Sequence, residues 1–510
     1  MQTLLANFHY RLRPLLDSNQ SADQAGFRPR RSTTDHLFTT SILQETADEW
    51  QLPMWSAAVD FKKAFDSITH ASIWESLAEQ HTPAPYIHLL SKLYQDQTGS
   101  VHTDRTSRPF NVLRGTKQGD PLSSLLFNSV SESIMRRAKQ KWASKKYGFK
   151  LQLHADDRLT NLRFADDILL LAGSLNHLTH MLTDLITEAR KAGLELHPDK
   201  TKIMHNGHRP PRSTRTPDSV HVLGMKIEIL PPYRSTKYLG RLLQHTTPHA
   251  TEIENRIATA WRKFHMLKQE LTGPTYSQSD RLRLFHGTVT PTILYGCEAW
   301  TLTTDLANRL RRTQRQMLRM IVRVPRRTSA NTITQAPQPA PEYQTNNQYD
   351  DAHQNSDEDD DDGCDVDSMP PDPTPNVYDD DDDDVNDVIL ELWVDWIKRA
   401  THKAEAAIAK LRINDWVSTV RQKKWQWVRK LSTMRNQEWM RQVIQWDPQH
   451  DPVYHVRRRT GRPKTRWIDD IRKHIEDHMG CDNMTISAIL DVASTDDWQD
   501  IGSNFTSHHM

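Results

Sequence analysis

The sequence has no long apolar run, few cysteines and, over one long stretch, no basic residue. Its mean hydropathy is −0.74, and no apolar run approaches the roughly twenty residues that a membrane-spanning helix needs. The N-terminal segment lacks the basic-then-apolar layout of a secretory signal. Cys297, Cys364 and Cys481 are too few and too far apart for a disulfide framework or a zinc finger. These absences exclude a membrane span and predict an intracellular, soluble protein.

The missing basic residues lie between Arg327 and Lys398, and the charge is distributed very unevenly as a result. The stretch from Asp350 to Asp387 holds 18 of the 65 acidic residues. The rest of the chain therefore has 66 basic residues against 47 acidic ones, a formal charge of +19, although the whole chain carries +1. A strongly basic remainder favours a polyanionic partner such as nucleic acid. Solubility is the alternative explanation for the charge.

Composition divides the 510 residues into regions. Residues 1–245 and 246–327 have ordinary folded patterning, the second part being helical. Residues 328–388 are rich in Pro, Asn, Gln, Ser and Asp, and too little apolar surface is present to offset the chain entropy, which predicts a disordered acidic linker. Residues 389–510 are Trp-rich, basic and helix-forming, which predicts a small α-helical C-terminal unit.

Two segments place carboxylates where a strand ends. A short apolar run, Trp55–Val59, ends at Asp60 and is followed by a turn and then by helical spacing from Ile68 to Leu77. In 162–171, β-prone residues flank Asp166 and Asp167, which predicts a hairpin with both carboxylates at its tip.

Adjacent aspartates most often form a solvated turn. The chain contains a second Ala-Asp-Asp string with which Asp166 and Asp167 can be compared. Asp156 and Asp157 also follow an alanine, but their neighbours are polar and no apolar strand follows them. Four apolar residues follow Asp167, so that hairpin is anchored in a core. Charge at a rigid tip with apolar flanks needs a cation. Carboxylate oxygens suit Mg²⁺, and two such ions can hold the attacking and leaving oxygens of an in-line displacement.

With Arg114–Ser123 between them, these segments resemble motifs A, B and C of reverse transcriptases, in the right order. The Phe-Ala-Asp-Asp and Gln-Gly-Asp-Pro-Leu-Ser strings resemble those of non-LTR (LINE-type) retrotransposons. The segments at 26–36, 192–202 and 222–240 resemble the fingers segment, motif D and motif E of that family. The resemblance covers about 1–325. It implies an α+β fold: a right-hand polymerase palm (an antiparallel sheet with packed helices), partial fingers and a helical thumb.

The resemblance also implies site residues and partners. Asp60, Asp166 and Asp167 are the expected catalytic residues and ligands of two Mg²⁺ ions, with Mn²⁺ as a substitute. The expected partners are an RNA template, a DNA primer or target, and dNTPs. Phe65 is the expected steric gate against a ribose 2′-hydroxyl, with an ordinary core aromatic as the alternative. The predicted dNTP contacts are Phe61, Phe65, Gln118, Gly119 and Lys200. A helix is expected to open with Asp120 and Pro121 after Gly119.

Several basic segments are candidates for contact with nucleic acid. In the predicted helix Asp305–Val324, four apolar residues form a core-facing stripe, and arginines occupy another side. An arginine row can follow a phosphate backbone, although a solvated helix face is the alternative. The candidate phosphate-binding residues are Arg28, Arg30, Arg31, Arg312, Arg315, Arg319 and Arg323.

The C-terminal region carries two further features. It holds nine of the fifteen tryptophans, which are either base-stacking residues or the core of a small helical domain. The tract at 457–464 resembles a minor-groove hook, except that Thr460 interrupts the pattern, and with Trp467 it resembles the tail of some non-LTR elements.

Departures from the family pattern leave two functions open. Ser124 replaces the usual proline, the chain starts in the middle of the fingers, and no endonuclease segment precedes it, which suggests a truncated element. The leading hypothesis is an RNA-directed DNA polymerase acting in the nucleus after a cytoplasmic phase. The alternatives are a catalytically decayed, retroelement-derived nucleic-acid-binding protein and, more weakly, a maturase. The oligomeric state does not follow from the sequence.

Overall fold

The computed structural model describes residues 2–117, 119–152, 157–208, 216–329, 389–450, 454, 456, 458–461 and 463–507. The chain forms two compact units, one made of Met1–Val322 with Ala404–Met510 and the other of Arg323–Lys403. The larger unit is mixed α and β, as expected from the sequence. Residues 404–510 belong to this unit, so the prediction of a separate C-terminal unit from residue 389 was wrong.

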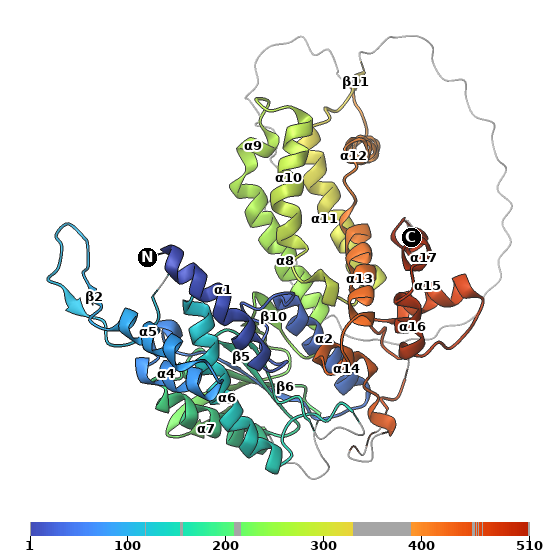
Figure 1. Ribbon diagram of the computed structural model, residues 1–510. Helices are drawn as coiled ribbons and strands as arrows, with labels where there is room; N and C mark the ends of the chain where they lie inside the picture. Colours follow the sequence, from blue (N-terminus) through green and yellow to red (C-terminus); the bar gives the residue numbers. More distant parts are fainter. Residues whose placement is uncertain are drawn as a thin grey trace, which may run out of the picture. The chain divides into compact units, whose positions relative to one another are not determined.

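A six-stranded sheet forms the centre of the larger unit (Figure 1), with the strand order β4-β5-β1-β6-β8-β7. All neighbouring strands are antiparallel except β6 and β8, which are parallel, so the sheet is mixed rather than purely antiparallel. The strands are β1 (Trp55–Val59), β4 (Asn161–Phe164), β5 (Asp167–Ala172), β6 (Lys202–His205), β7 (Ser219–Val222) and β8 (Met225–Leu230).

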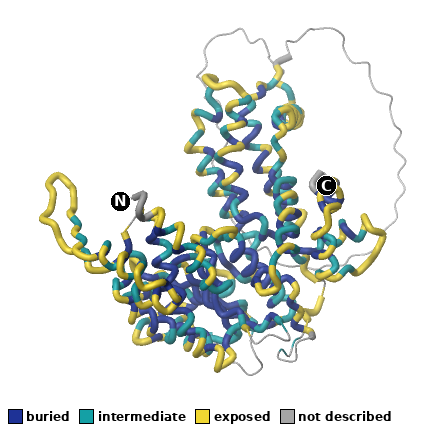
Figure 2. The backbone as a smooth tube through the Cα atoms, in the orientation of Figure 1, coloured by how far each residue is buried: buried dark blue, intermediate teal, exposed yellow. Residues whose placement is uncertain are grey.

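The two faces of the sheet are covered by different helices, because alternate residues of a strand point to opposite faces. Ala57 and Val59 belong to one core cluster, which includes residues of α1 and of α4 to α7. Ala58, between them, belongs to a second cluster with α2 and the C-terminal helices. Figure 2 shows the strands buried and the outer helix surfaces exposed. The helices of this part are α1 (Gln2–Asn19), α2 (Thr33–Glu49), α3 (Ala64–Ser67), α4 (His70–Glu79), α5 (Ala84–Tyr94), α6 (Ser123–Ser144) and α7 (Leu175–Lys191).

Local sequence explains several of these helix boundaries. The Ser174 hydroxyl accepts a hydrogen bond from the His177 N–H and so caps α7. Ser32 and Asp35 form a reciprocal capping box at the start of α2. Two short hairpins pair β2 (Thr98–Gly99) with β3 (Phe110–Asn111) and β9 (Thr236–Tyr238) with β10 (Arg241–Leu243). The loop between β2 and β3 is exposed along its length.

A group of helices that follows β10 has the thumb-like character expected from the sequence. These helices are α8 (Pro248–Met266), α9 (Lys268–Thr272), α10 (Gln278–Ile293) and α11 (Thr304–Val322), with a 3₁₀ turn η1 at Cys297–Ala299. The predicted apolar stripe of α11 is confirmed, since Leu306, Leu310, Met317 and Ile321 are all buried. They share a core with Ile408, Trp416 and Val420 from the C-terminal part of the same unit.

The C-terminal helices complete the larger unit. They are the end of α12 (Trp393–Lys410), then α13 (Trp416–Ser432), α14 (Trp439–Gln445), a 3₁₀ turn η2 (Pro448–His450), α15 (Asp469–Met479), α16 (Ile486–Ala493) and α17 (Trp498–Ser507). Phe38 of α2 contacts Trp427 and Trp467, with ring centroids 5.8 and 4.8 Å apart. These tryptophans therefore share a core with the sheet, which explains why this region is not an independent domain.

In the smaller unit, β11 (Thr328–Ser329) pairs with β12 (Ile389–Leu390), and the Trp396 indole N–H donates to the Val324 carbonyl at 2.8 Å. The predicted disordered linker, 328–388, lies outside the described residues apart from 328 and 329. No helix in the described part of the chain is long and apolar enough to cross a membrane.

Candidate active site

Asp60 follows β1 directly, in the middle of the sheet. All five residues of β1 are buried, so the strand that holds Asp60 is fixed by its core contacts. Beyond the strand, the Asp60 carbonyl accepts from the His197 N–H at 2.8 Å, and the Asp60 N–H donates to the Thr201 hydroxyl at 3.3 Å. The backbone at Asp60 is therefore held from both sides, as a metal ligand requires.

The predicted hairpin is present in the structure, with its turn one residue earlier than expected. Phe164 and Asp167 are paired across β4 and β5, so the two turn residues are Ala165 and Asp166. Ala165 has φ = 59°, a left-handed conformation that was not predicted for this residue. Asp166 therefore lies in the turn, whereas Asp167 is the first residue of β5.

Strand register brings Asp60 and Asp167 together. Val59 is paired with Ile168, so the next position in this antiparallel register sets Asp60 opposite Asp167. Side chains of opposite residues lie on the same face of a sheet, and like charges in such positions repel each other. Alternation places both carboxylates on the face of Ala58 and Leu169, the face that α2 covers further along the strands.

The electrostatics of the three carboxylates favour a cation. Burial, with a contribution from Asp60, raises the pKa of Asp166. Burial and then the charges of Asp166 and Asp60 raise the pKa of Asp167 to about 6, although this side chain is open to water on one side. Oδ2 of Asp60 is buried and accepts no hydrogen bond from the described residues. A divalent ion would relieve both the repulsion and the unsatisfied oxygen.

The carboxylates fit a shared ion rather than a closed protein cage. Among the described residues, no group of three or more His, Cys, Asp or Glu side chains is assembled closely enough to enclose a metal by itself. Mg²⁺ bound with a nucleotide keeps several waters and takes other ligands from phosphates, so a partial set of protein ligands is sufficient. The predicted ligands, Asp60, Asp166 and Asp167, would form such a partial set.

Two further predicted site residues are Lys200, which lies beside Asp60, and Phe65, which packs on Phe127. The Lys200 ammonium is 3.6 Å from Oδ2 of Asp60, and 66% of its side chain is exposed, so it can turn toward a phosphate. The half-buried Phe65 ring stacks on Phe127 with centroids 4.3 Å apart. One face is therefore packed while part of the ring stays open, an arrangement compatible with a gate.

Phe61 lies in the core beside the hairpin. It is 7% exposed and belongs to the core on the sheet face opposite to Asp60. Together with Asp166 it lines a small cavity on that face. Its contact with the nucleotide stays a prediction.

The segment before α6 differs in detail from its prediction. Gly119 has φ = 80°, and an added Cβ would meet nothing within 4 Å, so the backbone is open there. α6 begins at Ser123 rather than at Pro121. The Asp120 carboxylate still accepts a hydrogen bond from the Leu122 N–H at 2.9 Å, and Leu122 directly precedes the helix. Gln118 lies outside the described residues.

The three arginines near the fingers segment are held differently. Arg28 forms an ion pair with Asp17 at 2.6 Å, and Arg31 forms one with Glu438 at 2.5 Å. Both guanidinium groups are largely buried in these intramolecular pairs, which argues against phosphate contacts. Arg30 is exposed and has φ = 60°. Of these three arginines, Arg30 therefore remains the candidate for a phosphate contact.

The arginine row of α11 is shorter than expected. α11 ends at Val322, and Arg323 follows in a left-handed conformation at φ = 53° and belongs to the smaller unit. Arg315 forms an ion pair with Glu405 at 2.8 Å. Arg312 is exposed, whereas Arg319 is half-buried. Arg312 is therefore the candidate that the structure leaves best placed for a phosphate.

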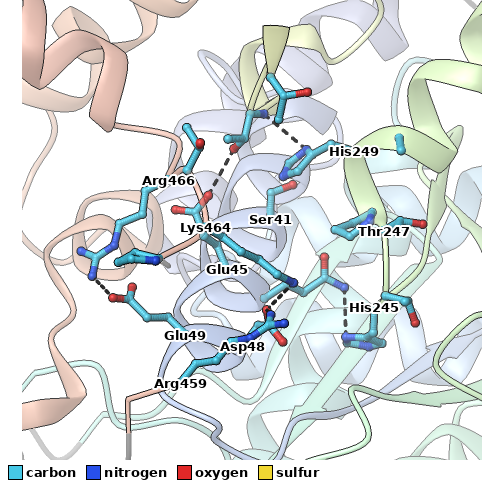
Figure 3. Close-up of a pocket in the computed structure, with 18 of the residues that line it drawn as sticks. Ser41, Glu45, Asp48, Glu49, His245, Thr247, His249, Arg459, Lys464 and Arg466 are labelled. Carbon is cyan, nitrogen blue, oxygen red and sulfur yellow. Dashed lines mark hydrogen bonds and ion pairs between the residues drawn. The ribbon is translucent and has the colours of Figure 1, made fainter. Parts of the chain in front are cut away.

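The C-terminal basic tract contacts the protein's own acidic surface (Figure 3). Lys464 donates to Asp48 at 2.8 Å, Arg458 lies 3.0 Å from Glu49, and Arg466 also contacts Glu49. The same residues line a cavity of about 460 Å³ bounded by α2, the start of α8 and this tract. None of the three catalytic candidates lines this cavity. Arg457 and Arg462, which belong to the predicted hook, lie outside the described residues.

The residues that brace the hairpin from outside were not predicted from the sequence. Asp23 and Gln24 are buried beside β4. Polar residues before a Gly-Phe-Arg string do not predict such a buried position. A buried ion pair, Arg163 with Glu132 at 2.7 Å, was also missed, since Arg163 lies in a strand that was expected to be simply apolar.

Parts of the chain are similar in sequence to known proteins. Residues 2–227 match the family model described as reverse transcriptase (RNA-dependent DNA polymerase). The chain is 28% identical over 226 residues to the Pol polyprotein of the retrotransposable element R2DM of Drosophila melanogaster, covering 44% of this chain and 20% of that protein. It is 32% identical over 165 residues to the R2 Pol polyprotein of Nasonia vitripennis, covering 32% of this chain and 15% of that protein.

A further relative is a transposon-derived protein, F52C9.6, of Caenorhabditis elegans, which is 34% identical over 166 residues, covering 32% of this chain and 57% of that protein. The chain thus spans between about a seventh and somewhat over half of the length of these relatives. Among solved structures, apo telomerase from Candida tropicalis matches with a TM-score of 0.36 and 13% identity, covering 62% of this chain and 50% of that one.

Proposed function

We propose that this chain is an RNA-directed DNA polymerase of the non-LTR (LINE) type, because residues 2–227 match the reverse transcriptase family model and parts of the chain are similar to R2 Pol polyproteins. It transfers a nucleotide from a dNTP to the 3′-hydroxyl of a DNA primer paired with an RNA template. The observation that carries the proposal is the meeting of Asp60 and Asp167 at adjacent strand ends on one face of the sheet, with Asp166 in the adjoining turn.

We propose that these three carboxylates hold two Mg²⁺ ions, with Mn²⁺ as a substitute; divalent ions are general to the family. When bound, such ions neutralise the carboxylates and stabilise charge on the attacking and leaving oxygens. The rigid strand end at Asp60 and the turn at Asp166 fix the ligand oxygens before substrate binds. The new bond joins the primer 3′-oxygen to the α-phosphorus, and the bond to pyrophosphate breaks.

Nearby side chains act on the nucleotide itself. Lys200, which lies 3.6 Å from Asp60, is positioned to neutralise the triphosphate or to donate a proton to the leaving pyrophosphate. The part of the Phe65 ring that Phe127 leaves uncovered faces the sugar and excludes a 2′-hydroxyl. Gly119 allows the backbone to approach the nucleotide closely, since a Cβ there would occupy open space.

Primer extension by the purified full chain tests this proposal. A DNA primer on an RNA template, with dNTPs and Mg²⁺, should be extended, and the Asp60→Asn variant should lose at least about a thousandfold in rate, because a ligand to both metal ions is lost. Salt-sensitive RNA binding by a folded chain that never extends a primer would contradict the polymerase and support the decayed, binding-only alternative.

A further inference from the structure

The turn that carries Asp166 needs support from outside the hairpin. Ala165 is left-handed at φ = 59°, which is unfavourable for a residue with a side chain. Such a conformation persists only where its surroundings hold it. β5 is held by β1, but β4 is the edge strand of the sheet, with no further strand on its other side in the described part of the chain. The open edge of β4 is therefore where a brace is needed.

A segment from the fingers side, 23–26, lies along this edge. The Arg163 N–H donates to the Asp23 carbonyl at 2.8 Å, and the Ala25 N–H donates to the Arg163 carbonyl at 2.9 Å. Gln24 and Arg163 form a parallel bridge. The segment thus continues the sheet for about two residues and ends beside the turn. The Trp439 indole N–H donates to the Asp23 carboxylate at 2.6 Å, which ties this segment to α14.

Gln24 bonds directly to the turn. Its side chain is fully buried, and Oε1 accepts from the Ala165 N–H at 3.1 Å and from the Gly26 N–H at 2.8 Å. Its Nε2 is also buried but has no hydrogen-bond partner among the described residues. The oxygen alone therefore makes the side-chain hydrogen bonds of Gln24, and it makes one of them to the strained residue next to Asp166.

Gly26 allows the segment to approach the turn. A Cβ at this position would lie 2.3 Å from the Ala165 nitrogen and 2.9 Å from the Phe164 carbonyl carbon, both of them backbone atoms that cannot easily move aside. The Gly26 carbonyl accepts from the Asn128 side chain at 2.8 Å, so α6 holds the segment from behind. Glycine is required here because of the close approach between two backbones.

From these contacts we infer that Gln24 and Gly26 are positioning residues that hold the Ala165–Asp166 turn, and with it the neighbouring Asp167, in the geometry needed to bind metal. The inference rests on the proposed function, since it concerns the same site. Gln24 contributes an acceptor oxygen and Gly26 contributes the absence of a side chain. Partners that orient metal ligands from behind typically change metal affinity or activity by about 10- to 100-fold when they are removed.

Substitutions at Gln24 separate the acceptor from the packing. Gln24→Met keeps the length and buries no new polar atom, while it removes the oxygen. Gln24→Glu keeps an acceptor oxygen in either protonation state. The matched control is Gln80→Met, because Gln80 is also fully buried and its side-chain hydrogen bonds go to Ser129 (two, at 2.8 Å), Ser133 (3.4 Å) and Gln20 (3.5 Å) rather than to the hairpin. Gly26→Ala provides a second, steric perturbation.

Two readouts are measured on the full chain: Mn²⁺ binding by electron paramagnetic resonance and primer extension over a range of Mg²⁺ concentrations. The dissociation constant for Mn²⁺ and the Mg²⁺ midpoint should rise about 10- to 100-fold in Gln24→Met and Gly26→Ala. Gln24→Glu should restore most of the loss. Gln80→Met should lower the melting temperature while leaving both metal readouts as in the wild type.

The outcomes distinguish this inference from the proposed function. Wild-type metal binding and extension in Gln24→Met would overturn the inference and leave the polymerase proposal intact. If the wild type binds Mn²⁺ but extends no primer, the polymerase proposal fails, and weaker Mn²⁺ binding by Gln24→Met still supports the positioning role. A wild type that neither binds Mn²⁺ nor extends a primer overturns both. Equal losses in Gln24→Met and Gln80→Met would show a general stability effect and contradict positioning.

Discussion

At the scale of single residues, the charge on Asp167 has a cost in folding stability. Burial, Asp166 and Asp60 raise its pKa to about 6 from an ordinary value of 3.8. A carboxyl whose pKa is raised on folding stabilises the fold when it is protonated, and this stability is lost as the pH rises from about 4 through about 6. Without metal, the charged site therefore strains the folded protein at pH 8.

We expect Asp167→Asn to melt at a higher temperature than the wild type at pH 8 in a chelator. Because water screens the open side of Asp167, the gain should be only about 1–2 °C. The difference in melting temperature between the variant and the wild type should shrink toward pH 4, where the wild-type carboxyl is protonated. Calorimetry at the two pH values measures this, with Asp157→Asn as the control. A difference that is the same at pH 4 and pH 8 would count against the charge repulsion.

Phe65 should control sugar selection. Its ring is half-buried on Phe127, and a smaller side chain would open space for a 2′-hydroxyl. Phe65→Val should raise the ratio of rNTP to dNTP incorporation on the order of 10- to 100-fold, the usual scale of steric discrimination in a pocket. Phe65→Tyr keeps the ring and should keep the selectivity. If Phe65→Val were less stable but equally selective, the residue would be an ordinary core aromatic.

At the scale of elements, α11 has one face in a core and another that remains basic. Arg309 and Arg315 are paired with acidic side chains, whereas Arg312 is exposed. An arginine that neutralises one phosphate adds close to one unit to the dependence of binding on salt concentration. On α11, Arg312 is therefore the candidate for a phosphate contact, and the paired Arg309 is its control.

Arg312→Ala should weaken binding of an RNA–DNA hybrid and reduce the slope of log affinity against log salt by about 0.9. Arg309→Ala, on the same helix, should leave the slope unchanged because Glu254 and Asp305 already hold Arg309. Fluorescence anisotropy at several salt concentrations measures both variants. An unchanged slope in Arg312→Ala would show that this face of α11 is only solvated.

Sequence patterns predicted some of these elements well and others poorly, for physical reasons. The carboxylates, the hairpin and the α11 stripe follow from local alternation and helical spacing, which a sequence displays directly. The turn position does not, because only the strained conformation of Ala165 moves it by one residue. The ion pair of Arg31 could not be predicted either, since its partner Glu438 lies 407 residues away in the chain.

At the scale of the whole molecule, seven of the nine C-terminal tryptophans belong to the structural core. Their spacing suits a core and a base-stacking surface equally, and only the contact with α2 decides between them. Trp467 is fully buried, its indole N–H donates to the Glu298 carbonyl at 2.8 Å, and its backbone N–H donates to Glu45 at 2.9 Å. Burial raises the pKa of Glu45 to about 7 at this junction.

Trp467→Ala should therefore destabilise the larger unit by about 3–5 kcal/mol, the usual loss for a large buried aromatic. Trp393→Ala is the control, because Trp393 is 51% exposed and lies in the smaller unit. Chemical denaturation followed by circular dichroism compares the two variants. If Trp467→Ala kept wild-type stability and lost only nucleic-acid binding, the tryptophan would act on bases rather than in the core.

The central claim is that Asp60, Asp166 and Asp167 form a polymerase centre, and one pair of variants tests it most directly. Asp166 and Asp157 both belong to an Ala-Asp-Asp string, but Asp157 lies outside the sheet and its carboxylate accepts from the Arg158 N–H. In single-turnover primer extension on an RNA template with Mg²⁺, Asp166→Asn should reduce the rate by at least about a thousandfold. Asp157→Asn should extend the primer at the wild-type rate. Equal rates in the two variants, or no extension by the folded wild-type chain, would contradict the claim.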